Sequence, residues 1–232
     1  MNDFKKIHPR LEVVVSKRAR RMALRLDIRA RVINIIVPSR TSMKKAYEFA
    51  ADNKDWIREK LAALPDAVPF AHGEIIPVLG IPRTIHITHK TSQKITEIHL
   101  TRDQLLVVTN KEDPSGRILR FLKELAREKI TELAHIKAEM TGKKIKAVVI
   151  RDTKSRWGSC APDRTLSFSW RLILAPHSAF DYVIAHEAAH LSHMDHSARF
   201  WKKCEEMSQY YKAGKDWMSD NGHSLHRYGV VD

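Results

Sequence analysis

The strongest constraint on this chain is the run His186-Glu187-Ala188-Ala189-His190. In an α-helix, two residues four positions apart lie on one face, about one turn apart, so both imidazoles can reach a single metal ion. Glu187 follows the first histidine at roughly 100° around the helix, where it can act on a water molecule at the metal without being a ligand. This is the H-E-x-x-H spacing of zinc hydrolases. We therefore predict a metal-binding helix with Glu187 as its acid–base residue.

A catalytic zinc usually has three protein ligands, and His193 and His196 are the candidates for the third. If the helix continued, His193 would lie about 10 Å along the axis from His186, whereas zinc–nitrogen bonds are only about 2 Å long. A ligand that arrives after the helix has ended is better placed. We predict that His186, His190 and His196 hold one zinc ion, with Asp195 as an orienting or turn residue. Three histidines would also accept nickel, cobalt or copper.

The two ends of this helix differ in how well they match known patterns. Pro176 marks its start, and Ser178 with Asp181 three residues later fits a capping box. After the helix, metzincins read H-E-x-x-H-x-x-G-x-x-H, with a glycine at the turn, but here that position is His193. We expect the turn to be made differently, at Met194-Asp195.

The composition is that of a soluble globular protein. The 232 residues are 43% hydrophobic and 29% charged, enough for one large domain or two modest ones. No run approaches the roughly 20 apolar residues that span a bilayer, and the N-terminus lacks the apolar core of a secretory signal. Two cysteines make no disulfide framework. We expect a cytoplasmic protein without a membrane partner.

The chain is strongly basic, with a net charge of +14 and a pI near 9.9. Such a surface favours polyanions such as nucleic acids and nucleotides, although it can also serve only to keep the protein in solution. The basic cluster at 17–21 could bind phosphate, but charged residues beside a strand more often form its solvated face.

Hydrophobic periodicity predicts an α+β fold with two regions. The first, 1–112, is rich in strands and opens with a small antiparallel sheet at 11–15, 21–27 and 32–38. It also contains a helix near 41–64, and further strands at 73–80, 83–88, 94–100 and 104–109. The second, 113–232, starts with a helix that runs from Pro114 to about Thr141. Short strands at 147–151 and 166–170 then precede the metal-binding helix.

Several motifs together suggest a family. They are Arg156-Trp157-Gly158-Ser159-Cys160, the segment 166–174, the metal-binding run, Met194-Asp195-His196-Ser197 and Phe200-Trp201. In combination they resemble the YgjP-like metal-dependent hydrolases, relatives of the SprT and WLM zinc peptidases. The resemblance is strongest over about 145–211 and extends weakly to Ser16-Lys17-Arg18 and 73–80. The family's usual Glu-Leu is Glu187-Ala188 here, a departure that affects packing.

The resemblance implies a minimal zincin-like catalytic domain, in which the active-site helix lies beside a small, mostly antiparallel sheet. It also implies zinc on the three histidines. We predict a zinc metallopeptidase that cleaves a peptide or protein, with Glu187 as general base. The segment 166–170 is the predicted edge strand for an extended substrate. An oxyanion donor is left open among Tyr210, Tyr211, His223 and Tyr228, while Trp157 and Cys160 are interpreted as packing residues.

Two other functions fit the same residues. The first is a metal-dependent hydrolase of nucleotide phosphate esters or anhydrides, which the basic surface would suit. The second is a basic nucleic-acid-binding protein with a structural zinc, which would need a fourth ligand from Cys160 or His193. The sequence does not name the substrate.

Overall fold

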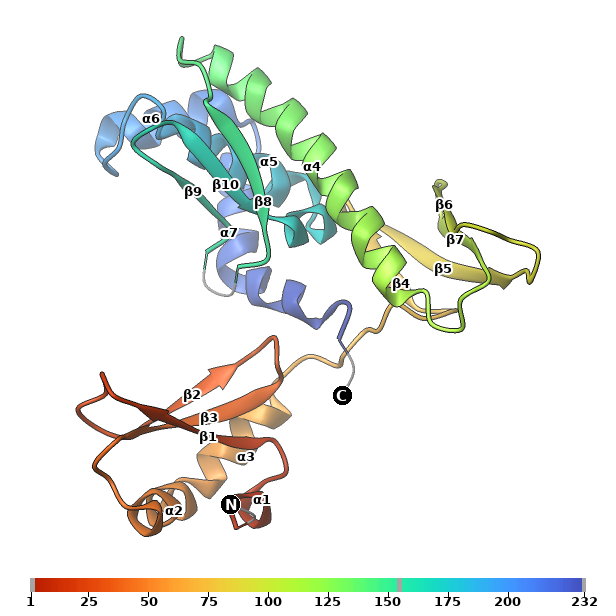
Figure 1. Ribbon diagram of the computed structural model, residues 1–232. Helices are drawn as coiled ribbons and strands as arrows, with labels where there is room; N and C mark the ends of the chain where they lie inside the picture. The colour runs from red at the N-terminus through yellow and green to blue at the C-terminus, as the bar shows by residue number, and fades with distance from the viewer. Residues whose placement is uncertain (1–2, 154–155, 231–232) are drawn as a thin grey trace. The chain divides into compact units, whose positions relative to one another are not determined.

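The computed structural model describes residues 3–153 and 156–230 (Figure 1). The chain divides into two compact units, one that ends at Ala67 and one that starts at Val68. Each unit has its own hydrophobic core. The predicted boundary lay at 112/113, about 45 residues later. The structure divides the chain earlier because Ile76, Ile85 and other residues of the second set of strands share a core with the metal-binding helix.

The N-terminal unit packs a three-stranded sheet against helices. Its elements are α1 (Phe4–Ile7), β1 (Leu11–Ser16), β2 (Ala23–Asp27), β3 (Val32–Pro38), α2 (Met43–Asp52) and α3 (Lys54–Ala62). The central strand is β3, which pairs antiparallel with β2 but parallel with β1. The prediction of an antiparallel sheet was therefore wrong for β1. Alternation of apolar residues identifies the buried face of a strand but not the direction of its neighbour.

The helix predicted near 41–64 is two helices. Ser42 caps α2, since its Oγ accepts a hydrogen bond from the backbone N–H of Lys45 at 3.4 Å. The break falls at Asn53, which leaves the helical conformation at φ −106° and ψ 17°. Its side-chain amide donates to the carbonyl of Phe49 at 2.8 Å. This side-chain bond competes with the helical ladder and ends α2 there.

The C-terminal unit begins with a four-stranded sheet of order β4-β5-β7-β6. Its strands are β4 (Ile75–Val78), β5 (Ile81–His89), β6 (Glu97–Leu100) and β7 (Gln104–Thr109). The β5–β7 pair is parallel, and the two outer pairs are antiparallel. Leu105 and Val107 of β7 are fully buried while their neighbours are not, which gives the sheet one core face.

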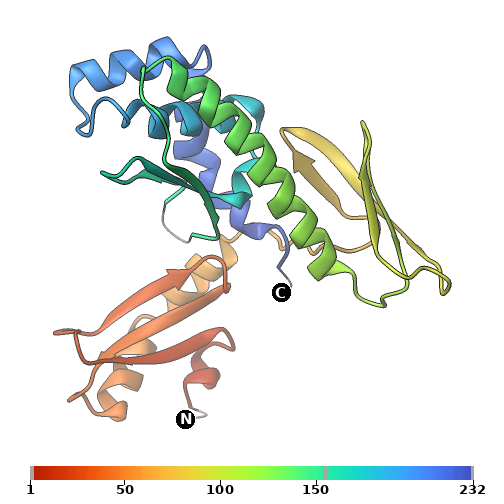
Figure 2. The same ribbon diagram turned by 45° about the horizontal axis from the view of Figure 1, so that its top comes forward.

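The long helix α4 (Ser115–Glu139) connects this sheet to the rest of the unit. Pro114 is the N-cap of this helix, which begins at Ser115, one residue after the predicted start. Asp113, just before it, accepts a hydrogen bond from the backbone N–H of Ser115 at 2.8 Å. Gly142, at φ +65°, follows the last turn, as expected for a position that favours glycine. In Figures 1 and 2, α4 runs between the four-stranded sheet and a second, smaller sheet.

That smaller sheet has the order β8-β10-β9, from β8 (Ala147–Arg151), β9 (Gly158–Cys160) and β10 (Thr165–Ser169). β10 is central, parallel to β8 and antiparallel to β9. The predicted edge strand at 166–170 is therefore an inner strand, and β8 and β9 are the two edges. Residues 158–160 of the motif Arg156-Trp157-Gly158-Ser159-Cys160 form β9. Lys154 and Ser155 lie outside the described residues.

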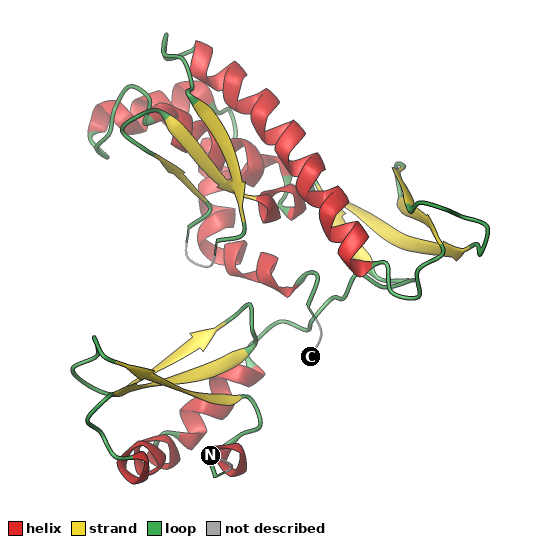
Figure 3. Ribbon diagram, in the orientation of Figure 1, coloured by secondary structure: helices red, strands yellow, loops and turns green. Residues whose placement is uncertain are grey.

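Helices fill the remainder of the unit (Figure 3). They are η1 (Trp170–Leu174), α5 (His177–Ala189), α6 (Ala198–Met207), α7 (Tyr211–Asn221) and η2 (Gly222–Arg227). The metal-binding run lies in α5 and its C-cap. The described residues thus form seven α-helices and three small mixed sheets, which confirms the predicted α+β class. None of these helices is long and apolar enough to cross a membrane.

A buried ion pair joins α4 to α5, and a buried arginine joins η1 to η2. Asp181 of α5 pairs with Lys137 of α4 at 2.6 Å and accepts the hydroxyl hydrogen bond of Ser208. The predicted capping box was therefore wrong, because Asp181 is turned into the core. Arg171 of η1 donates to the carbonyls of Leu225 at 3.1 Å and Tyr228 at 2.8 Å, and so ties η2 to the start of α5.

Candidate metal centre

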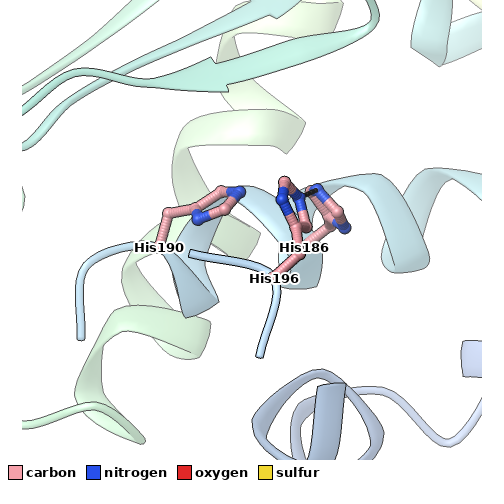
Figure 4. A group of neighbouring side chains, drawn as sticks. All are labelled: His186, His190 and His196. Atoms are coloured by element: carbon pink, nitrogen blue, oxygen red, sulfur yellow. Dashed lines mark hydrogen bonds between the residues drawn. The ribbon is translucent and has the colours of Figure 1, made fainter. Parts of the chain in front are cut away.

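Three histidines meet at the C-terminal end of α5 (Figure 4). The potential ligand nitrogens of His186, His190 and His196 all lie within 4.8 Å of one another. The Nε2 atoms of His186 and His196 are 3.3 Å apart. In a tetrahedral zinc site with bonds of about 2.0–2.1 Å, ligand atoms are separated by roughly 3.3 Å. One pair of donor atoms therefore has the separation found in a tetrahedral zinc site, and the geometry brings together the three predicted ligands.

The chain turns sharply after α5, and the turn places His196. The helix ends at Ala189 with His190 as its C-cap, still in a helical conformation, so His186 and His190 share a face. The N–H groups of Ser192 and His193 both bond to the carbonyl of Ala189, at 3.1 and 3.0 Å. The turn thus begins earlier than the predicted Met194-Asp195.

Asp195 is a turn residue. Its Oδ1 accepts a hydrogen bond from the backbone N–H of Ser197 at 3.3 Å. Hydrogen bonds from the Ser197 side chain and then from its backbone lower the pKa of the exposed Asp195 carboxyl. The bond links the turn to α6 and leaves His196 exposed beside the two helical histidines.

His190 is oriented by a backbone carbonyl and an aromatic ring. Its Nδ1 lies 2.9 Å from the carbonyl oxygen of His193, which favours the tautomer with hydrogen on Nδ1 and leaves Nε2 for a metal. Phe200, fully buried in α6, stacks on the imidazole at 4.4 Å and 28°. His193 therefore takes part through its backbone, and its ring is not in the three-histidine group.

His186 is held neutral by its surroundings. Burial lowers the pKa of His186 to about 4, and the charges of His190, His196 and Lys215 act in the same direction. Its Nδ1 is buried and has no hydrogen-bond partner within the described part of the chain. A neutral imidazole is the form that binds a metal ion, so this histidine is prepared as a ligand across the neutral pH range.

Glu187 is almost completely buried, with 7% of its surface exposed. Burial raises the pKa of Glu187 to about 8, and the positive charge of Arg156 opposes that rise. Gly158 of β9 lies directly on the side chain, since a Cβ there would be 2.7 Å from Oε1. The carboxyl is thus confined between α5 and the edge strand.

Aromatic side chains lie near the three histidines. Trp201 lies 5.7 Å from the His186 ring, Tyr182 lies 5.9 Å from it, and Tyr211 is 5.8 Å from Tyr182. Of the four residues left open as oxyanion donors, Tyr211 belongs to this group of rings, whereas Tyr210 packs on His177. The pairing of Phe200 with Trp201 directly after His196 was the available sequence signal.

Trp157 and the cysteines lie outside the group of ligands. Trp157 is half-buried and packs on His226 at 5.1 Å, as expected for a packing residue. Cys160 and Cys204 are free thiols. Within residues 3–153 and 156–230, the three-histidine group is the only cluster that could hold a metal, and it contains no fourth protein ligand. That leaves one position open, as in catalytic zinc sites.

Comparison with known proteins identifies the family of this chain. A family model described as "YgjP-like, metallopeptidase domain" matches residues 20–221. A solved structure described as the metallopeptidase zymogen of Pyrococcus abyssi abylysin is similar at 22% identity and a TM-score of 0.35, over 39% of this chain and 92% of that one. No curated protein matches. The residues matched by the family model include the whole metal centre.

Proposed function

The chain belongs to the YgjP-like metallopeptidase family, and from this premise we propose that it is a zinc-dependent peptidase with Glu187 as its general base. It is a metal-dependent hydrolase of the peptidase type. The observation that supports zinc is the convergence of three imidazoles, one pair of which has the nitrogen separation of a tetrahedral zinc site. We propose His186, His190 and His196 as the three ligands.

Glu187 is proposed to move the proton. When bound, the metal supplies a Lewis acid that lowers the pKa of water and polarises a carbonyl. Glu187 follows a ligand on α5 but is not part of the ligand group, so its carboxylate is free to accept a proton from the attacking water and deliver it to the leaving amine. A cation among the histidines would act with Arg156 to favour the charged carboxylate against its burial.

The edge strand β9 is the proposed guide for the substrate. It pairs with β10 on one side, and the sheet order leaves its other edge without a strand among the described residues. Gly158 of β9 contacts Glu187, so a peptide that extended the sheet along β9 would pass the proposed base. The absence of a side chain at Gly158 lets the backbone approach the carboxyl closely.

Metal analysis and one variant test this function. We expect the purified chain to bind one zinc ion, to lose peptidase activity on chelation and to regain it with zinc. Glu187→Gln keeps the shape of the side chain but cannot accept the proton. It should bind zinc with unchanged stoichiometry and lose at least about 100-fold in kcat, within the range of general-base catalysis. Full activity of Glu187→Gln would refute its role.

The substrate panel should contain a mixed peptide library, casein, nucleotides and proteins bound to DNA. Metal-dependent cleavage of the first two, without nucleotide hydrolysis, is the expected result. Release of phosphate from nucleotides by the wild type, and its loss in Glu187→Gln, would instead support the nucleotide hydrolase predicted as the alternative.

A further inference from the structure

Lys215 of α7 places a positive charge beside the three histidines. Its Nζ lies 4.6 Å from the ring centroid of Trp201 and 5.6 Å from that of Tyr211. The Trp201 ring lies in turn 5.7 Å from the His186 ring and 5.4 Å from the His196 ring. The ammonium group therefore contacts a ring that itself neighbours two of the proposed ligands.

Lys215 contacts aromatic rings, whereas some lysines of the same unit pair with carboxylates. Lys203 and Lys146 each lie within 2.8 Å of a carboxylate on the protein surface. Lys215 is exposed, and no carboxylate of the described residues lies within 4.0 Å of its ammonium. A cation within about 6 Å of an aromatic face is attracted to it, so the two rings hold the lysine in position. The result is an oriented positive charge with no anion of its own.

We propose that Lys215 binds a carboxylate of the peptide substrate close to the bond that is cleaved. The proposal rests on the proposed peptidase function, and it adds the chemical class of substrate that the centre prefers. A carboxylate can come from an aspartate or glutamate side chain, or from the C-terminus of the peptide. Both would form the same charge-assisted hydrogen bond with the ammonium.

The location of Lys215 assigns it to substrate recognition. The attacking water and the reacting carbonyl belong at the histidine nitrogens and Glu187, whereas Lys215 lies against the rings of Trp201 and Tyr211. A residue at that position contacts the part of the substrate next to the reacting group. Its removal should therefore weaken binding of acidic substrates while the reaction of neutral substrates is retained.

The test uses the full chain loaded with zinc and matched pairs of fluorogenic peptides. One arm compares aspartate or glutamate with asparagine or glutamine next to the scissile bond. The other arm compares a free C-terminus with an amide. The variants are Lys215→Met, Lys215→Arg and the control Lys212→Met. Lys212 is exposed on the same helix, so Lys212→Met removes the same charge at a neighbouring position.

We expect the wild type to prefer the carboxylate member of at least one pair by about tenfold in kcat/KM, mainly through KM. Lys215→Met should bring the ratio of the kcat/KM values for the carboxylate and neutral members of that pair close to one. Lys215→Arg should keep most of the preference, and Lys212→Met should keep all of it. The arm that shows the preference identifies the source of the carboxylate.

A second measurement is independent of turnover. In the Glu187→Gln background, the affinity for the acidic peptide should fall about tenfold on Lys215→Met, while the affinity for its neutral partner should not change. Cleavage without any carboxylate preference, or a preference that survives Lys215→Met, would overturn the inference and leave the peptidase function intact. No metal-dependent cleavage of any peptide by the wild type would overturn both.

Discussion

Gly158 of the edge strand lies in direct contact with Glu187 of α5: a Cβ at position 158 would be only 2.4 Å from Cγ of the glutamate. Real Cβ atoms do not approach other atoms so closely, so any side chain at this position must displace the glutamate or the strand. The glycine in the motif Arg156-Trp157-Gly158-Ser159 therefore has a physical role. It lets the edge of the sheet and the proposed base occupy adjacent space.

Gly158→Ala should reduce peptidase activity by about 10- to 100-fold, because a shift of about 1 Å in a catalytic group can have an effect of this size. Zinc stoichiometry should be unchanged, since the three atoms nearest the added methyl group all belong to Glu187. The control is Gly116→Ala in the first turn of α4, where a Cβ would meet no atom within 4 Å. Wild-type activity of Gly158→Ala would mean that Glu187 does not need its observed position.

Replacement of His193 and His196 should have different effects on zinc affinity. His196→Ala removes a proposed ligand and should weaken zinc binding by at least about 100-fold. His193→Ala keeps the backbone carbonyl that contacts His190 and should change affinity by less than about 10-fold. Competition titration with a chelating dye measures both. A larger loss for His193→Ala than for His196→Ala would reverse the assignment of the third ligand.

Lys137 and Asp181 should be far more important for stability than a surface ion pair. Their side chains are 10% and 7% exposed, so Lys137→Met leaves a buried carboxylate without its partner and should cost about 3–5 kcal/mol. The pair of Lys146 with Asp163 is 62% and 49% exposed, and Lys146→Met should cost less than about 1 kcal/mol. Urea unfolding compares the two variants. Equal losses of unfolding free energy in Lys137→Met and Lys146→Met would contradict the expected effect of burial.

The metal-free protein should show a pH dependence that comes from Glu187. Burial raises the pKa of Glu187 to about 8 in the folded chain, against 4.5 for the unfolded group. Between these values the folded state binds a proton that the unfolded state has lost, so stability falls as the pH rises and levels off above about pH 8. The total change is at most roughly 4–5 kcal/mol.

Glu187→Gln removes this titration, so the difference in unfolding free energy between the wild type and the variant isolates it. In the presence of a chelator, the wild type should lose stability relative to Glu187→Gln from pH 4.5 to 8. The opposing titration of His186, whose pKa burial lowers to about 4, is common to both proteins and cancels. Parallel curves for the two proteins would contradict the prediction.

The grouping of the three histidines could be predicted because it depends on short-range geometry. The four-residue spacing of His186 and His190 requires only a helix, and the axial rise of a helix disfavours His193 as the third ligand. The approach of Gly158 and Lys215 to the centre could not be predicted in this way. It depends on which strand flanks β10 and on how α7 packs beside α6, and neither is encoded in local spacing.

The fold shows the same division between local and long-range information. Alternation of buried residues located β3 and β7, and Pro114 marked the start of α4. The parallel pairing of β1 with β3, and of β8 with β10, joins strands that are separated by other elements. The domain boundary was missed for this reason, since strands β4 to β7 join a core that is completed by helices much later in the chain.

The anchoring of η2 by Arg171 has a consequence for the order of synthesis. The guanidinium of Arg171, just ahead of α5, bonds to the carbonyls of Leu225 and Tyr228. Residues 225 and 228 leave the ribosome after every proposed metal ligand has been made. A nascent chain therefore carries all three histidines before the segment that Arg171 anchors exists. The two bonds between η1 and η2 can form only after every residue of the proposed centre has been synthesised.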